Sequence, residues 1–274
     1  MRSALEILTL ATERTEVVLE TDALIEAPNW DPDGQSLLVN GDGRLFRVRL
    51  DGKPEMALVD SGFADACNND HGISPDGKRI AISHRTEEGS TIFTLPAGGG
   101  VPEKVTQKNP SYWHGWSPDG ETLAFCGQRD GRFDVYTIPA AGGFEKRLTD
   151  EGHNDGPDYS PDGDWIWFNS DRSGQAQIWR IRPNGTDLAR MTEDGLVDWF
   201  PHPSPDGERV LYLAYPAGTT GHPRDKEVAL CLMRPDGSGA RRVLELFGGQ
   251  GTINVPCWAP DGAAFAFVRY APEG

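Results

Sequence analysis

Short runs of apolar residues recur along the chain, and each of them follows a tight polar turn. The six runs cover residues 37–39, 80–82, 123–125, 165–168, 210–213 and 265–268. Because they do not alternate apolar with polar positions, each run is expected to be a strand that is buried on both faces. After each of the first five, a polar turn leads to another apolar run, such as 45–48 or 92–95. The pattern predicts antiparallel sheets stacked face to face.

The tripeptide Pro-Asp-Gly precedes every one of these runs, beginning at Pro32, Pro75, Pro118, Pro161, Pro205 and Pro260, at intervals of 43, 43, 43, 44 and 55 residues. Proline presets φ in a β-turn, aspartate suits the next position, and glycine accepts the positive φ at the exit. Turn chemistry therefore explains the six aspartates better than a metal site or acid–base chemistry. Six units of four strands predict an all-β fold, a six-bladed β-propeller of four-stranded antiparallel blades.

The two ends of the chain are expected to close the ring. The first apolar segments, 5–8 and 16–19, precede the first Pro-Asp-Gly, and the last unit stops after its two inner strands. Pairing two N-terminal with two C-terminal strands completes blade six from about residues 1–20 and 252–270, and leaves no open sheet edge. We therefore expect residues 1–274 to form a single propeller domain.

Charge and hydropathy narrow the range of partners. The chain has 42 acidic and 26 basic residues, for a formal net charge of −16, and its Lys and Arg residues do not cluster. Such a surface repels nucleic acid, so no nucleic-acid partner is expected. No apolar stretch approaches the ~20 residues of a membrane helix, so membrane insertion is not expected either. Four widely spaced cysteines mildly favour a reducing compartment. We expect a cytoplasmic protein as the sequence stands, and a periplasmic one if a signal peptide has been removed.

The repeat unit resembles those of TolB-like propellers. The resemblance is carried by segments such as 159–168, followed by Ser170-Asp171-Arg172 and then by Ile178-Trp179-Arg180-Ile181, and it extends over essentially the whole chain. Related repeats occur in prolyl oligopeptidases, tricorn proteases and oligogalacturonate lyases. No Gly-x-Ser-x-Gly motif of a serine peptidase is present. The resemblance implies the propeller fold, and its implication for function is weaker, because one fold hosts many sites.

A candidate binding site lies where the chain approaches each innermost strand. These segments are rich in polar and aromatic residues, and strands that converge on the axis would place them around one funnel. The candidate residues at the funnel mouth are Asp70, His71, Trp113, His114, His153, Asp155, Asp198, Trp199, His202 and Asn254.

Three interpretations of the funnel remain open. In the simplest, its polar residues satisfy the backbone and one another. In the second, imidazoles and a carboxylate hold a divalent metal, with His71 and His114 as the candidate ligands, although no His-x-His pair is present. In the third, Trp113, Trp199 and Phe200 form an aromatic lip for a peptide or a sugar.

The last interval between repeats is long because of residues 216–226, which are expected to lie on the funnel face between the second and third strands of blade five. Neighbouring loops on that face carry Arg85, Arg129 and Arg172. A long loop on a rigid scaffold is often functional, although a longer surface loop is also tolerated at little cost. We expect this loop to lean over the mouth of the funnel and to bound a ligand site.

Two functions follow from these observations. The first is a non-catalytic TolB-like propeller that binds a protein segment or a small ligand at the funnel. The second is a small metal-assisted lyase or hydrolase that acts on a sugar-like substrate in the same funnel. No nucleophile–base pair is recognisable, which favours the first. The first function requires no cofactor, whereas the second requires a divalent metal.

Overall fold

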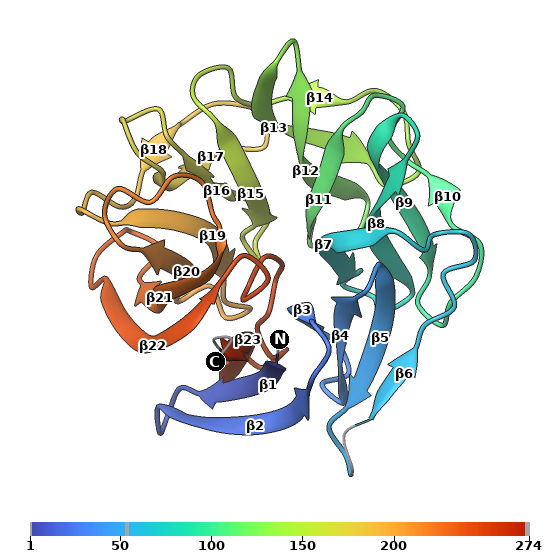
Figure 1. Cartoon of the computed structure of the whole chain (residues 1–274). Helices are drawn as coiled ribbons and strands as arrows, with labels where there is room; N and C mark the ends of the chain where they lie inside the picture. Colours follow the sequence, from blue (N-terminus) through green and yellow to red (C-terminus); the bar gives the residue numbers. More distant parts are fainter. Residues whose placement is uncertain (1, 53–54, 272–274) are drawn as a thin grey trace.

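Six antiparallel sheets surround a central axis in the computed structural model, which describes residues 2–52 and 55–271. The innermost strands β3, β7, β11, β15 and β19 converge on this axis (Figure 1). Met1, which falls within the expected closing segment, lies outside the described residues. The six-bladed propeller predicted from the repeat is confirmed.

Five blades follow one another along the chain, each with four strands in order from the axis outward. Blade one contains β3 (Glu26–Trp30), β4 (Ser36–Gly41), β5 (Arg44–Arg49) and β6 (Met56–Leu58). Blade two contains β7 (Cys67–Ile73), β8 (Arg79–Thr86), β9 (Gly89–Pro96) and β10 (Glu103–Lys104). Blade three contains β11 (Ser111–Trp116), β12 (Thr122–Arg129), β13 (Arg132–Pro139) and β14 (Lys146–Arg147).

The next two blades repeat this order with one enlargement. Blade four contains β15 (Asn154–Tyr159), β16 (Ile166–Ser170), β17 (Gln177–Ile181) and β18 (Ala189–Arg190). Blade five contains β19 (Val197–Pro203), β20 (Val210–Tyr215), β21 (Arg224–Met233) and β22 (Arg241–Gly249). The long repeat interval is thus shared between the loop at 216–223, which is shorter than expected, and two unusually long outer strands.

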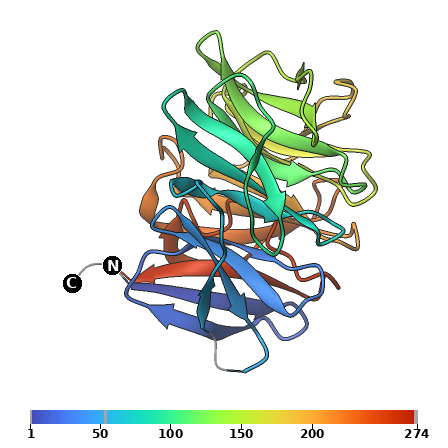
Figure 2. The same cartoon turned by 90° about the vertical axis from the view of Figure 1, so that its right-hand side faces the viewer.

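Blade six joins the two ends of the chain. Strand β1 (Arg2–Thr9) lies between β2 (Arg14–Thr21) and β23 (Ala264–Ala271), pairing with β23 from Arg2–Ala271 to Thr9–Ala264. The blue N-terminal strands and the red C-terminal strand lie side by side in the same blade (Figure 2). The innermost position is filled by an irregular segment that forms a single bridge, Trp258 to Phe265. The predicted closure of the ring by strands from both ends is confirmed, but blade six has three strands, because the second expected C-terminal strand is reduced to this single bridge.

The Pro-Asp-Gly turns are held by their own side chains. In blade two, the Ser74 hydroxyl donates to Asp76 Oδ1 at 2.7 Å and accepts from the Arg79 amide, while Asp76 Oδ1 accepts from the Lys78 amide. The Ser74 hydrogen bond is the main reason why the pKa of Asp76 falls to about 2. Gly77 has a φ of +71°, a conformation that favours glycine. The turn interpretation of these aspartates is therefore confirmed.

The second strands of the blades form the core. Every residue of β4, β16 and β20 is buried, as expected for a sheet sandwiched between two others. Large aromatic side chains such as Phe125, Phe168 and Phe265 are fully buried between blades. No helix able to span a membrane occurs in the part of the chain that the structure describes.

Candidate functional site

Each of the five regular innermost strands carries a break in its pairing register. The breaks fall between Glu26 and Asn29, Cys67 and His71, Trp113 and Gly115, Asp155 and Asp158, and Trp199 and His202. Such β-bulges re-aim side chains out of the regular alternation. Three residues inside the bulges, Asp70, His114 and Phe200, line one cavity on the funnel face.

This cavity has a volume of about 250 Å³ and receives side chains from blades two to five and from the segments that lead into blade six. We call it the axial cavity. Its lining consists of Asn68, Asp70, Tyr112, His114, Cys126, Phe133, His153, Asp155, Phe200, His222, Gln250 and Asn254.

His114 is the electrostatic centre of the axial cavity. Its Nε2 lies 3.1 Å from Asp155 Oδ1 and 3.9 Å from Asp70 Oδ1, and its Nδ1 lies 3.3 Å from the Asn254 carbonyl oxygen. Burial opposes protonation, but the two carboxylates outweigh it and raise the pKa of His114 to about 9. An imidazolium can donate from Nε2 to Asp155 and from Nδ1 to the Asn254 carbonyl oxygen, with the charge of Asp70 close by.

The two carboxylates differ in their surroundings. Burial raises the pKa of Asp70 to about 6. Burial also acts on Asp155, but the hydrogen bond and the charge of His114 hold the pKa of Asp155 below its usual range. The cavity therefore contains one firmly ionised carboxylate and one that ionises near neutral pH.

The loop at 216–223 reaches the cavity, as expected from its length and its position in the repeat. His222 Nε2 lies 3.7 Å from Asp155 Oδ2. The His222 ring contacts Trp199, with centroids 4.4 Å apart, and Phe200, at 5.2 Å. Burial lowers the pKa of His222, so its ring is neutral at pH 7. The candidate set at the funnel mouth omitted His222, although the loop that carries it was identified as part of the site.

Phe200 adopts a φ of +54°, which is unusual for a bulky residue. Its fully buried ring stacks against His114 with centroids 6.2 Å apart. Strained backbone of this kind persists where the surrounding structure holds it, and it clusters at binding sites. The bulge in β19 thus places an aromatic wall beside the charged centre.

Five of the ten candidate residues line the axial cavity, and five lie elsewhere. The first group is Asp70, His114, His153, Asp155 and Asn254. Among the others, His71 is fully buried, with Nε2 3.5 Å from the Leu38 carbonyl oxygen. Trp113 packs on Gly72, where a Cβ would come within 2.1 Å of its ring.

The remaining three face different surroundings. His202 is buried between Asp158, 3.0 Å from Nδ1, and the Ile253 carbonyl oxygen, 2.7 Å from Nε2. Asp198 is fully buried away from the cavity, and burial raises its pKa to about 7. Trp199 lines a neighbouring groove beneath the loop at 216–223.

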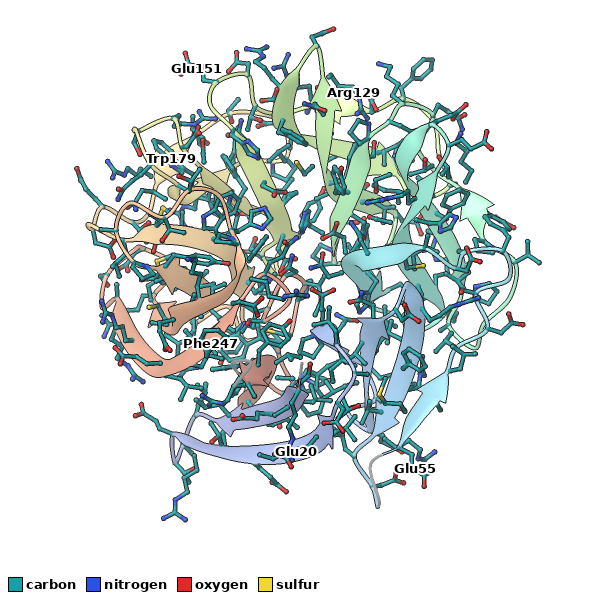
Figure 3. The ribbon with its side chains drawn as sticks, in the orientation of Figure 1. Glu20, Glu55, Arg129, Glu151, Trp179 and Phe247 are labelled. Atoms are coloured by element: carbon teal, nitrogen blue, oxygen red, sulfur yellow. The ribbon has the colours of Figure 1, made fainter. Side chains whose placement is uncertain are left out.

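The arginines expected on this face have different partners. Arg129 binds Glu145 through two hydrogen bonds of 3.0 and 2.8 Å, and it lies towards the outside of the ring (Figure 3). Arg172 donates to Asn154 Oδ1 at 2.9 Å. Arg85 lines a groove next to the axial cavity.

A metal ion does not fit this set of residues. Within residues 2–52 and 55–271, no three His, Cys, Asp or Glu side chains are grouped so as to hold one. His71 is fully buried and lies outside the axial cavity, which His114 lines. The two candidate ligands are therefore not brought together by the fold.

The closed ring of six blades around an axial cavity defines a β-propeller, and the comparisons with known proteins specify which kind. The family profile of the TolB beta propeller domain matches residues 114–224. The uncharacterised protein Atu1656 of Agrobacterium fabrum is 54% identical over 99% of this chain and 94% of its own length. The chain therefore belongs to the TolB-like β-propeller family.

Solved structures agree with this assignment. An Agrobacterium tumefaciens protein provisionally assigned as TolB is 53% identical, with a TM-score of 0.98 over 100% of this chain and 99% of its own. TolB from Acinetobacter baumannii is 21% identical, with a TM-score of 0.69 over 91% of this chain and 64% of its own. An oligogalacturonate lyase in complex with manganese is 16% identical, with a TM-score of 0.56 over 82% of this chain and 67% of its own. The last two show similarity of fold alone.

Proposed function

We propose that the axial cavity is a ligand-binding site and that the protein binds a protein segment or a small ligand there without catalysis. The observation that carries this proposal is the series of bulges, which turn side chains from successive blades towards one hollow. A concave site with a few convergent polar groups and shifted pKa values is the usual form of a binding site.

The chemistry of the lining supports binding rather than turnover. The Cys126 thiol lies in the cavity wall, but burial raises its pKa well above the usual range, so it is a poor nucleophile. His114 is held as an imidazolium between acceptors, and an imidazolium cannot serve as a general base. The arrangement can hold and orient a partner.

The alternative is a metal-assisted lyase or hydrolase acting on a sugar-like substrate in the same cavity. This alternative is suggested by the fold that the chain shares with an oligogalacturonate lyase in complex with manganese. The lining of the axial cavity argues against a metal-assisted enzyme, because no three of its His, Cys, Asp or Glu side chains are grouped so as to hold a divalent ion.

A cavity-blocking variant tests the proposal. Asn68 lines the axial cavity and is half-buried, so Asn68→Trp should fill the cavity, and it also removes the two hydrogen bonds between Asn68 and Asp70. Gln107→Trp, at an exposed position, is the matched control. Both variants and the parent are screened for changes in melting temperature with peptides, small amines and uronic oligosaccharides, with and without manganese.

We expect at least one class of ligand to raise the melting temperature of the parent and of Gln107→Trp, but not of Asn68→Trp. Ligands that stabilise all three proteins equally would contradict the proposal. Formation of an unsaturated product from oligogalacturonate, abolished by Asn68→Trp, would establish the alternative instead.

A further inference from the structure

Two grooves adjoin the axial cavity. A groove of about 580 Å³ between blades two and three shares Asn68 and Tyr112 with the cavity. A second groove of about 570 Å³, beneath the loop at 216–223, shares His153 and His222 with it. The two grooves therefore adjoin the cavity at different parts of its wall. We call them together the cross-face trough.

The shape of the trough favours an extended ligand. At about 250 Å³ the central cavity is smaller than the roughly 300–1,000 Å³ that encloses a whole small molecule, and it suits one inserted side chain. The two grooves offer room for the rest of a chain on either side. Thr220 in one groove and Arg85 in the other provide exposed polar groups for a backbone.

The centre of the trough has an unused acceptor. Asp70 is only 5% exposed, and its Oδ2 accepts a hydrogen bond from Asn68 at 2.5 Å. Its Oδ1 receives no hydrogen bond from any described residue and lies 3.9 Å from His114 Nε2, beyond hydrogen-bonding distance. Asp70 lines the axial cavity, so a donor that enters the cavity can bind this oxygen.

The charge around this acceptor favours a cation. Asp70 and Asp155 share the imidazolium of His114. Glu26, which accepts from Asn69 at 3.4 Å, lies nearby, but burial raises its pKa and Arg224 faces it, so the negative charge at the cavity comes mainly from the two aspartates. Aromatic rings, which attract cations at their faces, complete the walls of the cavity. They belong to Tyr112, Phe133 and Phe200.

We propose that the cross-face trough binds an extended polypeptide segment that inserts one lysine or arginine side chain into the axial cavity, where it donates to Asp70 Oδ1. This rests on the proposed function and specifies its ligand. A uronic oligosaccharide would be repelled by the same carboxylates, and a small free amine would leave both grooves empty. The net charge of −16 also favours a basic partner.

The test selects peptides from a random library on the parent protein and measures their affinity by fluorescence polarisation. We expect the selected peptides to share a Lys or Arg. Replacing that residue by Met, or Asp70 by Asn in the protein, should each weaken binding about tenfold or more. Making both changes should cost little more than one, because the two groups contact each other. Asp65→Asn, an exposed carboxylate of the same blade, is the control.

The outcomes separate this inference from the proposed function. If the selected peptides lack a basic residue but bind the Asn68→Trp variant more weakly than the parent, the inference is overturned and the proposed function stands. Peptides insensitive to Asn68→Trp would overturn both. Failure to select any peptide would overturn the inference, and the ligand screen above would then decide the function.

A second measurement does not depend on the folding of Asp70→Asn. Lowering the pH from about 7.5 to about 5 protonates Asp70 in the parent, so the basic peptide should bind about tenfold more weakly. The titratable groups that face Asp70 are His114, Asp155, Glu26, Tyr112 and Cys126, and Asn68 donates to it. The peptide with Met in place of the basic residue should show no such change, and an equal change for both peptides would overturn the inference.

Discussion

His114 and Asp155 pair across the boundary between blades three and four, with Nε2 and Oδ1 3.1 Å apart and both side chains almost fully buried. His114 leaves the regular alternation of β11 because it is the bulged residue, and Asp155 stands at the edge of the bulge in β15. The pair therefore joins two blades at the axis and also fixes the charge of the axial cavity.

Removing the imidazolium should destabilise the protein. His114→Gln leaves two buried carboxylates without their cation, so we expect a loss of about 3 kcal/mol in the free energy of unfolding at pH 7. Urea denaturation measures this loss. His153→Gln, at an exposed ring, is the control and should cost less than about 0.5 kcal/mol.

The same pair predicts a dependence of stability on pH. The folded pKa of His114, about 9, lies above its ordinary value, so its contribution is present below about pH 6.5 and is lost as the pH rises through about 9. The gap in stability between the parent and His114→Gln should thus narrow from pH 7 to pH 10. A constant gap over that range would show that His114 is not charged in the folded protein.

Asp198 should weaken the fold at higher pH. Its carboxylate is fully buried and forms no ion pair within the described part of the chain, and burial raises its pKa to about 7, an effect that the Thr192 hydroxyl offsets only in part. The folded state therefore keeps a proton that the unfolded state loses near its ordinary pKa of about 3.9, so stability declines as the pH rises from about 4 to 7.

Asn cannot ionise, so Asp198→Asn should be more stable than the parent by more than about 1 kcal/mol at pH 8, and the advantage should shrink towards pH 4. Thermal or urea unfolding across this range measures the difference. Glu227→Gln, at an exposed position, should show no such trend. A variant that is less stable than the parent at pH 8 would mean that Asp198 is ionised and has a partner.

Closure of the ring by β1 predicts that this strand contributes to the stability of the whole propeller. Leu5 of β1 is fully buried in a cluster with residues of blade one and of β23, including Val39 and Val268. Leu5→Ala should cost about 3 kcal/mol, because the N-terminal strands belong to the propeller. Leu58→Ala, at a residue that is 62% exposed on β6, should change stability by less than about 0.5 kcal/mol. Equal effects of the two substitutions would mean that β1 does not close the ring.

The loop at 216–223 should matter for binding more than for stability. Replacing residues 216–222 by the shorter loop of blade four, residues 171–176, alters the closure cost by only a few tenths of a kcal/mol. The melting temperature should therefore change little. The selected peptides should bind about tenfold or more weakly, because the wall formed by His222 is removed. Unchanged affinity would place the ligand away from this loop.

The fold could be predicted from the sequence because it repeats local signals. Pro-Asp-Gly specifies a turn by backbone chemistry alone, and apolar runs identify strands that are buried on both faces. The closure followed from which strands were missing at each end. The irregular segment around Trp258 could not be predicted, since its single bridge depends on contacts distant in the sequence.

The cavity could be predicted only in part. Its neighbourhood followed from strand direction, but the bulges decide which side chains face the axis, so His114 enters the cavity while Trp113 packs in the core. The sequence does contain a signal for three of the bulges. A glycine or proline follows the side chain that lines the cavity in His114-Gly115, Asp155-Gly156 and Phe200-Pro201. Glycine or proline within a strand often marks a bulge.

The most direct test of the account is a crystal structure of the protein with a selected basic peptide. We predict an extended segment in the cross-face trough, with its lysine or arginine nitrogen about 2.8 Å from Asp70 Oδ1. A peptide bound instead on the opposite face, in the hollow lined by Trp116, Tyr159 and Trp258, would contradict the assignment of the axial cavity as the binding site.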